Sequence, residues 1–396
     1  MKSLIVKPGL LPEIIHVPPS KSYANRALVL GALKKSVVTI FNLPEASDVT
    51  FLVEAFKKIG LEIHGQKDQL AMNGCFPECE PSMGAEIHVG EGGTTARFLA
   101  CLLSLGSAPY TLVLGQRLKQ RPWDEFIQLV QSLGGKARLV EEKLFIQGPI
   151  HVPQELKVDC QRTTQFASGF ELALAFKDCK IIPTHLASSQ SYWSMTDSVI
   201  QHFTQHDEYT VPADWSSASF PLAFGALKQD IFFPGLKPDP LQADSKFFDL
   251  LNSMKALSET PEGLRVHPGK LSGNIVFDCS DCLDLVPALS FYLAHIEGSH
   301  ELQKIENLIH KESDRLQQVL SLLALFHVKA SSDGHTLWIE GEKNISSGEV
   351  NPALPDDHRM VMAGALFLRF HQGGKLSPVS AVSKSYPRFF ELLSKK

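Results

Sequence analysis

The chain has 396 residues, of which 44% are hydrophobic and 20% charged, and its formal net charge is −5. Because this length exceeds what one hydrophobic core usually supports, two domains are expected. The acidic balance argues against bulk binding to nucleic acid or to a membrane surface, so any strongly cationic site must be local.

The cysteine content and the N-terminal sequence favour a reduced, cytoplasmic protein. Seven cysteines occur without a regular framework, and the first residues, MKSLIVKPGL, do not resemble a signal peptide. The most apolar stretches, such as residues 99–115, contain Gly, Ser and Pro and do not resemble spanning helices. We therefore expect a cytoplasmic enzyme or binding protein without a membrane or nucleic-acid partner.

Residues 17–33, VPPSKSYANRALVLGAL, introduce the dominant pattern of the chain. A pair of prolines precedes a polar cluster with Lys21, Ser22 and Arg26, and an apolar helix follows. Cations at a helix start oppose the helix dipole, which favours negative charge at that end. An anionic ligand bound at this helix N-terminus would resolve the conflict.

The same pattern, a polar cluster followed by an apolar helix, recurs along the chain. The clusters centre near residues 22, 93, 163, 216, 284 and 358. A second, more amphipathic helix is expected after each, over residues 48–60, 121–135, 194–203, 245–257, 311–326 and 383–396.

Strands are expected between and after these helices. Residues 61–74, 136–148 and 327–341 are typical of hairpins, and residues 110–115 and 180–186 are typical of single strands. Helix, helix and strand pair, with a further strand between the helices, make a unit of roughly 66 residues that fills the chain six times. The sequence thus predicts an α/β protein with three units in each of two domains, and Pro212 lies near the expected crossover.

The predicted helix starts carry the residues that could bind anions. Lys21 and Arg26 lie in the first cluster, and Arg121 precedes Pro122 at an expected first helical position. If the helix starts converge, hydroxyls and backbone N–H groups can hold phosphate oxygens while arginines bind carboxylates. Further polar residues in these clusters are Gly93, Thr94, Arg97, Thr163, Thr164, Gln165, Ser189, Tyr192, Asp284, Lys311, Glu312, Arg315, Asp357, His358, Arg359 and Lys384.

These motifs resemble the 5-enolpyruvylshikimate-3-phosphate synthase family of enolpyruvyl transferases. The stretches that carry the resemblance are PSKSYANRAL, GTTAR, QRP, KESDR, DDHRM and SKSYP, in this order along the chain. The resemblance implies a two-domain inside-out α/β barrel made of six βαβαββ units. It implies domains at residues 20–212 and at 1–19 with 213–396, and an active site in the cleft between them.

The resemblance also implies the reaction and its residues. The enolpyruvyl group of phosphoenolpyruvate would pass to the 5-hydroxyl of shikimate 3-phosphate by addition and elimination, with Lys21, Asp284 and Glu312 catalytic. The implied ligands of shikimate 3-phosphate are Lys21, Ser22, Arg26, Thr163, Thr164, Gln165, Ser189, Tyr192, Asp284, Asn307 and Lys311. The implied ligands of phosphoenolpyruvate are Lys21, Gly93, Arg121, Gln165, Arg315, Arg359 and Lys384. No cofactor or metal is required, and a monomer is expected.

The chain departs from the usual family pattern at several positions. Thr163 and Thr164 stand where serines are usual, Glu91 and Gly92 precede Gly93 in place of Asn-Ala, and Phe98 replaces a frequent proline. Glu91 would add negative charge near the anion site unless it points away. These departures affect the expected turnover rate and glyphosate response more than the reaction class.

Alternative interpretations of the motifs remain open. The KESDR stretch could be a salt-bridged helix start, Asp284 could be an N-cap, and His358 could orient a neighbour instead of moving a proton. The single Cys-x-x-Cys at Cys279 and Cys282 is a weak zinc signal.

Two alternative functions belong to different protein classes. The sister transferase family that acts on UDP-N-acetylglucosamine carries a reactive cysteine near the Arg121 position, where this chain has none. A catalytically impaired anion-binding homologue is the other alternative. The retained carboxylates Asp284 and Glu312 argue against it, because anion binding alone gains nothing from them.

Overall fold

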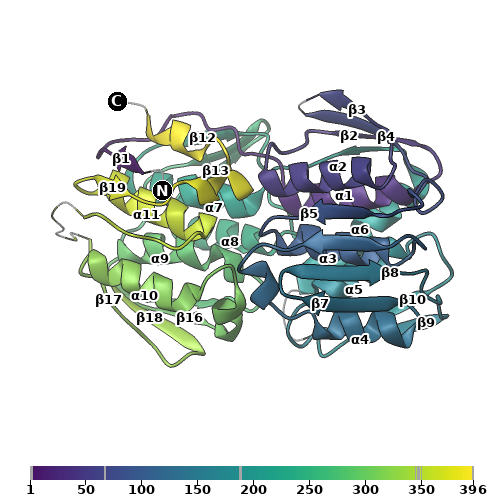
Figure 1. Cartoon of the computed structure of the whole chain (residues 1–396). Helices are drawn as coiled ribbons and strands as arrows, with labels where there is room; N and C mark the ends of the chain where they lie inside the picture. The colour runs from purple at the N-terminus through teal and green to yellow at the C-terminus, as the bar shows by residue number, and fades with distance from the viewer. Residues whose placement is uncertain are drawn as a thin grey trace. The chain divides into compact units, whose positions relative to one another are not determined.

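The computed structural model describes residues 3–66, 68–186, 190–343, 345, 348 and 350–394. The chain divides into two compact units (Figure 1). We call Pro19–Pro212 the first unit, and Met1–Pro18 with Ala213–Lys396 the second unit.

Helices that are buried on all sides form the core of the first unit. They are α1 (Lys21–Leu33), α3 (Gly93–Leu103) and α5 (Gln165–Ala173), and they contact one another. In α1 every residue from Tyr23 to Ala32 is buried, which explains why its apolar residues are not confined to one face. The amphipathic helices α2 (Ser47–Lys58), α4 (Asp124–Ser132) and α6 (Gln190–Gln205) complete the unit.

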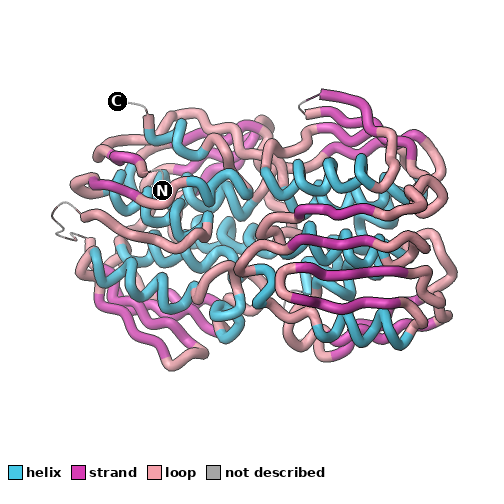
Figure 2. Tube along the Cα trace, viewed as in Figure 1, coloured by secondary structure: helices cyan, strands magenta, loops and turns pink. Residues whose placement is uncertain are grey.

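Small sheets pack against these helices. The strand order β11-β2-β4-β3 defines one sheet, β5-β6-β8-β7 a second, and the parallel pair β9 and β10 a third. The strand bounds are β2 Val37–Phe41, β3 Ile63–Gln66, β4 Gln69–Asn73, β5 Ala85–His88, β6 Tyr110–Val113, β7 Lys136–Val140, β8 Lys143–Gln147, β9 Glu155–Asp159, β10 Lys180–Thr184 and β11 Glu208–Thr210. Figure 2 shows these strands in magenta along the trace.

The second unit has a comparable helical core. Helices α7 (Trp215–Lys228), α9 (Val286–Ala294) and α11 (His358–Phe370) contact one another, and each is buried along nearly its whole length. Stacked and edge-on aromatic rings join them, as between Phe224 and Phe291 and between Phe291 and Phe367. Helices α8 (Lys246–Ser253) and α10 (Arg315–Leu325) are amphipathic.

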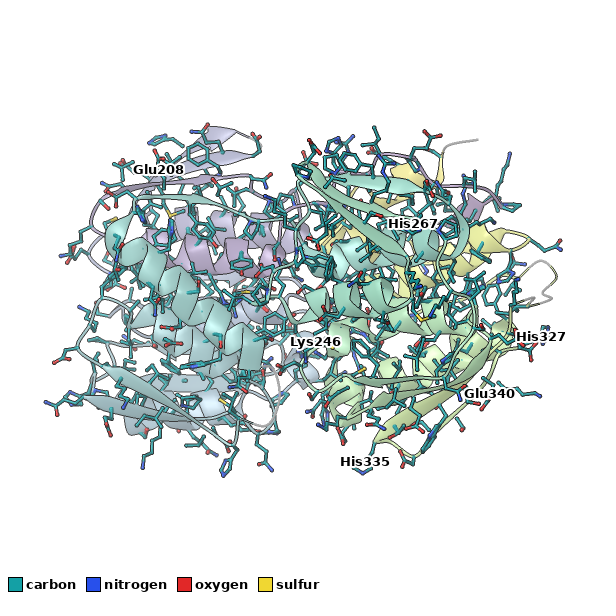
Figure 3. All side chains as sticks on the ribbon, turned by 180° about the vertical axis from the view of Figure 1, so that it is seen from behind. Glu208, Lys246, His267, His327, His335 and Glu340 are labelled. Carbon is teal, nitrogen blue, oxygen red and sulfur yellow. The ribbon has the colours of Figure 1, made fainter. Side chains whose placement is uncertain are left out.

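The sheets of the second unit have the orders β15-β16-β18-β17, β12-β14-β13 and β1-β19. The strand bounds are β1 Leu4–Val6, β12 Ile231–Pro234, β13 Leu257–Thr260, β14 Gly263–Val266, β15 Ile275–Asp278, β16 Gly298–Gln303, β17 Lys329–Ser332, β18 Thr336–Gly341 and β19 Gly374–Leu376. The exposed Glu340 lies on β18, and the exposed His335 lies in the turn between β17 and β18, as Figure 3 shows from behind.

Most of the predicted elements are confirmed. All the apolar helices form, and the predicted hairpins become the pairs β3–β4, β7–β8 and β17–β18. The helix expected over residues 383–396 is wrong, because Ser380–Lys384 and Phe389–Leu393 form short 3₁₀ turns. Pro387, between them, has no N–H group to continue a helix.

The start of α4 also differs from the prediction. The helix begins at Asp124 with Trp123 as its N-cap, so Pro122 does not occupy the first helical position. Arg121 instead ends the short 3₁₀ turn η1 (Leu118–Gln120). Within the described residues, no helix is both long and apolar enough to cross a membrane.

Candidate active site

Helix α1 begins at Lys21 with no acidic residue in its first turn, as the sequence predicted. The Lys21 ammonium forms an ion pair with Asp48 of α2, with 2.8 Å between Nζ and Oδ2. The Asp48 side chain is almost fully buried, whereas that of Lys21 keeps 17% of its surface exposed. The Asp48 carboxylate therefore orients the Lys21 ammonium, which remains accessible to a ligand.

Arg26 lies one turn further along α1 and is buried. Its guanidinium donates to Thr196 Oγ1 and to the backbone oxygens of Ser22 and Tyr192, each at 2.9 Å. The ring of Phe98 lies 5.2 Å from the guanidinium carbon. Burial lowers the pKa of Arg26 to about 10. Since its acceptors in these bonds are neutral, Arg26 keeps a positive charge that an anion can neutralise.

Gly93, Arg121 and Gln165 come together although they are far apart in the sequence. A Cβ atom added to Gly93 would clash with the Arg121 guanidinium and lie 3.2 Å from Gln165 Oε1. Gly93 is the first residue of α3 and Gln165 the first of α5. Glycine at this position therefore leaves room for the Arg121 guanidinium to lie beside the Gln165 amide oxygen.

The remaining first-unit candidates lie around the start of α5 and on α6. Thr163 Oγ1 accepts the backbone N–H of Gln165 at 3.3 Å, and the buried Thr164 is the N-cap residue of α5. The Tyr192 ring lies 5.9 Å from the guanidinium carbon of Arg26. Ser189, the other residue predicted here, lies outside the described residues.

The departures Glu91 and Phe98 have clear structural roles. The Glu91 carboxylate accepts the backbone N–H groups of Arg117 and Leu118, the latter at 3.0 Å. Backbone N–H groups in the turn before η1 thus stabilise the negative charge of Glu91. Phe98 is fully buried and packs under Arg26, so the aromatic ring supports the cation.

In the second unit, Asp284 lies among three cations. Its carboxylate is 2.7 Å from Arg315 Nη1, 3.1 Å from Arg359 Nη2 and 3.3 Å from Lys311 Nζ. Burial alone would raise the pKa of Asp284. The three cations overcome this and hold its pKa well below the usual range. The carboxylate is therefore ionised.

A second carboxylate, Asp357, fixes Arg315 from the other side. Arg315 Nε lies 3.0 Å from Asp357 Oδ2, and the hydroxyl of Ser313 donates to the same oxygen at 3.0 Å. Asp357 also caps α11 by accepting the backbone N–H of Arg359. Burial opposes ionisation here too, but the Arg315 charge outweighs it, and the pKa of Asp357 is lowered.

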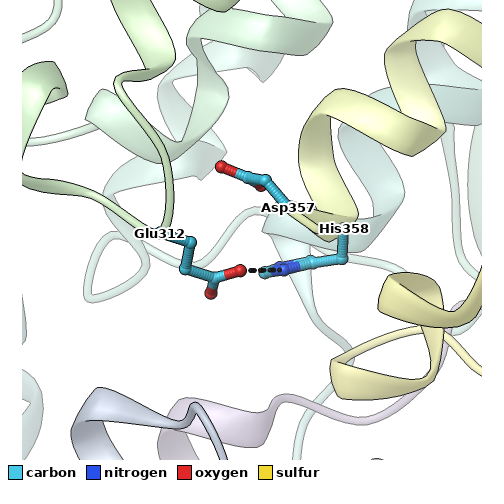
Figure 4. Close-up of side chains that lie close together, drawn as sticks. All are labelled: Glu312, Asp357 and His358. Atoms are coloured by element: carbon cyan, nitrogen blue, oxygen red, sulfur yellow. Dashed lines mark hydrogen bonds and ion pairs between the residues drawn. The ribbon is translucent and has the colours of Figure 1, made fainter. Parts of the chain in front are cut away.

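Glu312 lies beside this network in the loop before α10. His358 Nδ1 and Glu312 Oε2 are 2.9 Å apart. Figure 4 marks this hydrogen bond with a dashed line. The other ring nitrogen of His358 is 3.0 Å from Arg359 Nη1. Lys384 Nζ lies 3.9 Å from Glu312 and 3.1 Å from Asp356. Burial lowers the pKa of Lys384, but these carboxylates reverse the effect and raise it.

These contacts decide two of the open alternatives. Asp284 does not cap a helix, because Leu285 is the N-cap residue of α9 and the Asp284 carboxylate faces the arginines. Lys311 and Arg315 both pair with Asp284, so the KESDR segment is joined to another part of the chain. Asn307 lies half-buried in the turn Glu306–His310, which contacts α10.

A metal ion is a poor fit to the carboxylates of this network. Glu312, Asp357 and His358 place potential ligand atoms within 4.8 Å of one another (Figure 4). Asp357 already accepts from Arg315, Ser313 and a backbone N–H group, and Lys384 approaches Glu312. A divalent cation would have to displace these donors and share the space with Arg315 and Lys384.

Two carboxylates beside the candidate residues, one in each unit, were not singled out from the sequence. Asp48 orients Lys21, and Asp244 is buried close enough to Asp284 and Arg359 to feel their charges. Burial, with a smaller contribution from Asp284, raises the pKa of Asp244 to about 7. Both lie at the start of a helix or turn, where acidic residues are common, so the local sequence held no signal for either.

Comparison with known proteins shows the family of this chain. A sequence model of the family described as EPSP synthase (3-phosphoshikimate 1-carboxyvinyltransferase) matches residues 6–206 and 200–393. A 3-phosphoshikimate 1-carboxyvinyltransferase from Clostridium perfringens is 30% identical over 419 residues, covering 99% of this chain and 97% of the relative. One from Thermococcus kodakarensis is 31% identical over 396 residues, with 95% of each chain covered.

Solved structures show the same fold. An EPSP synthase from Acinetobacter baumannii superimposes with a TM-score of 0.77 at 20% identity, covering 99% of this chain and 97% of the other. The fold is a mixed α/β fold shared with that structure. Because the family model matches nearly the whole chain, this protein belongs to the EPSP synthase (3-phosphoshikimate 1-carboxyvinyltransferase) family.

Proposed function

We propose that this protein transfers the enolpyruvyl group of phosphoenolpyruvate to the 5-hydroxyl of shikimate 3-phosphate and releases inorganic phosphate. Family membership and the names of its relatives support this reaction. The observation that carries it is the Asp284 carboxylate, held by Lys311, Arg315 and Arg359. Such a cluster offers both anion-binding groups and a proton acceptor.

In this proposal residues of both units bind the substrates, and Lys21, Asp284 and Glu312 are catalytic. The proposed ligands of shikimate 3-phosphate are Lys21, Ser22, Arg26, Thr163, Thr164, Gln165, Ser189, Tyr192, Asp284, Asn307 and Lys311. Those of phosphoenolpyruvate are Lys21, Gly93, Arg121, Gln165, Arg315, Arg359 and Lys384. The two groups would act on one pair of substrates, as the family relationship suggests.

The proposed chemistry is addition followed by elimination. The 5-hydroxyl oxygen bonds to C2 of phosphoenolpyruvate while C3 gains a proton, and the adduct then loses a proton from C3 and expels phosphate. Asp284, with Lys21, accepts the hydroxyl proton, and Glu312 gives and retakes the proton at C3. His358 orients Glu312 through their 2.9 Å hydrogen bond.

The cations around Asp284 explain how a strongly ionised carboxylate can act as a base. While Arg315, Arg359 and Lys311 hold it, its lowered pKa makes it a weak proton acceptor. Substrate phosphate and carboxylate groups compete for the same cations. Once these anions bind, part of the charge stabilising Asp284 is withdrawn, and its pKa rises toward a value that suits a base.

We also infer that the fold is the six-unit barrel expected for the family, with three βαβαββ units in each of two domains at residues 20–212 and at 1–19 with 213–396. The sheets β11-β2-β4-β3, β5-β6-β8-β7 and β15-β16-β18-β17 support this. In each, one parallel pair is followed by two antiparallel pairs in the same order.

The direct test measures phosphate release from phosphoenolpyruvate with and without shikimate 3-phosphate. Release that requires shikimate 3-phosphate is expected. Release driven instead by UDP-N-acetylglucosamine would assign the chain to the sister reaction, and tight binding of both ligands without release would identify an impaired homologue. We further expect a cytoplasmic monomer without a cofactor, and light scattering in solution tests the monomer.

A further inference from the structure

Arg97 is a fully buried cation that was not assigned to either substrate. It lies on α3, one turn after Gly93, and only 1% of its surface is exposed. Its guanidinium carbon lies 5.0 Å from the Phe166 ring and 5.6 Å from the Trp123 ring. These flat contacts hold the guanidinium in one plane and orientation.

The polar contacts of Arg97 are directed at the residues proposed to bind phosphoenolpyruvate. Arg97 Nη1 donates to Gln165 Oε1 at 2.5 Å, and Nη2 donates to the backbone oxygen of Pro122 at 3.1 Å. Pro122 directly follows Arg121. One buried guanidinium therefore contacts both the Gln165 side chain and the segment that carries Arg121.

The bond from Arg97 determines which way the Gln165 amide faces. Gln165 Oε1 accepts from Arg97, and its Nε2 donates to Thr94 Oγ1 at 3.0 Å. An amide nitrogen carries a second hydrogen, which remains for a ligand. If the amide turned over, its NH₂ group would face the Arg97 guanidinium, and neither group can accept a hydrogen bond from the other.

The charge of Arg97 also favours an anion at this place. Burial lowers the pKa of Arg97 well below its ordinary value, and the nearby Arg121 and Arg162 cations lower it further, while Glu125 opposes them. Glu125 itself is bonded to Arg162. An anion beside Gly93 would relieve the repulsion between Arg97 and Arg121.

We propose that Arg97 is a positioning residue for the anion subsite near Gly93: it fixes the orientation of the Gln165 amide and anchors the segment that carries Arg121. The inference rests on the proposed function, because that function identifies the anion as phosphoenolpyruvate. Arg97 itself does not touch the substrate. It acts through Gln165 and Arg121.

The test is a double-mutant cycle between Arg97→Met and Gln165→Ala in the full chain. Arg97→Met is expected to raise the KM for phosphoenolpyruvate about tenfold or more and the KM for shikimate 3-phosphate less than about threefold. In the Gln165→Ala background the same substitution is expected to add less than about threefold. Additive effects in the cycle would overturn the proposal.

Arg97→Lys serves as the conservative variant if Arg97→Met does not fold. It keeps the charge but loses the planar fork, so an intermediate KM is expected, and an unchanged KM would contradict the role in orienting the amide. Arg138→Met is the matched control, because Arg138 also stacks on a ring, that of Phe145, but lies exposed on β7. It is expected to leave both KM values unchanged.

A crystal structure of the Arg97→Lys variant separates this proposal from the proposed function. Loss of the Gln165–Thr94 hydrogen bond is expected whatever reaction the protein catalyses. Gln165 and Arg121 unmoved in that structure would refute the inference. A wild-type protein without turnover would refute only the assigned reaction.

Discussion

Four buried arginines beside the candidate residues, two in each unit, have different kinds of partner. In the first unit, Arg26 and Arg97 donate to backbone oxygens, a hydroxyl and an amide, and both face aromatic rings. In the second unit, Arg315 and Arg359 pair with the carboxylates Asp284 and Asp357.

This difference suggests a division of labour. Cations with neutral partners keep an unbalanced charge and gain most from a bound anion. The charge of a cation paired with a carboxylate is already neutralised. When an anionic substrate binds these cations instead, the carboxylate becomes available to accept a proton. Arg26 is therefore suited to holding an anion, and Asp284 is suited to accepting a proton.

Removing Asp284, the carboxylate that pairs with three cations, is expected to have the largest effect on proton transfer. Asp284→Asn is expected to lower kcat by about 10²–10⁴-fold, because the amide keeps the shape but cannot accept a proton. Steady-state phosphate release measures this. Glu259→Gln, which changes an exposed carboxylate on β13, is the control and is expected to leave kcat unchanged. A kcat within a few-fold of wild type would assign the base elsewhere.

Removing one arginine from each unit compares the two environments by the loss in the free energy of unfolding. Arg315→Met leaves the buried Asp357 without its arginine and removes one of the three cations beside Asp284, which costs about 3–5 kcal/mol. Arg26→Met removes bonds to neutral groups only, and about 1–3 kcal/mol is expected. Urea unfolding of the two variants gives both values. Equal losses would show that carboxylate pairing does not distinguish the units.

Asp244 makes a pH-dependent prediction for the second unit. Its pKa is about 7 in the folded state, so between pH 4 and 7 the folded state binds more protons than the unfolded state. The free energy of unfolding therefore falls as pH rises through this window, by at most about 1.4 kcal/mol per pH unit from this group. Above pH 7 the contribution is constant.

The measurement is the urea midpoint of wild type and Asp244→Asn at pH 5 and pH 8. The variant is expected to lose less stability than wild type between these pH values. Glu171 of the first unit, whose pKa burial raises to about 8, provides the matched comparison through Glu171→Gln. An Asp244→Asn variant with the same pH dependence as wild type would contradict the assignment.

The smallest effect is expected from metal removal. Arginine and lysine side chains already pair with the carboxylates near His358. Treatment with a chelator is therefore expected to change kcat by less than about twofold. A large loss that added divalent ions restore would place a metal at Glu312, Asp357 and His358.

Much of the local structure was predictable because it depends on short-range patterns. The alternation of polar clusters with apolar helices and the positions of the hairpins follow from residue spacing. The role of glycine at position 93 follows from the space that a side chain there would need. The last predicted helix failed at Pro387, which has no backbone N–H group to continue a helix.

The sequence alone determined that cations gather at helix starts, since each start has its own signature within a few residues. Only the tertiary structure decided which partner each cation has. The pairing of Asp48 with Lys21, of Asp357 with Arg315 and of Gln165 with Arg97 joins segments that are far apart in the sequence. Charge and hydrogen bonding act through distance in space, and folding sets that distance.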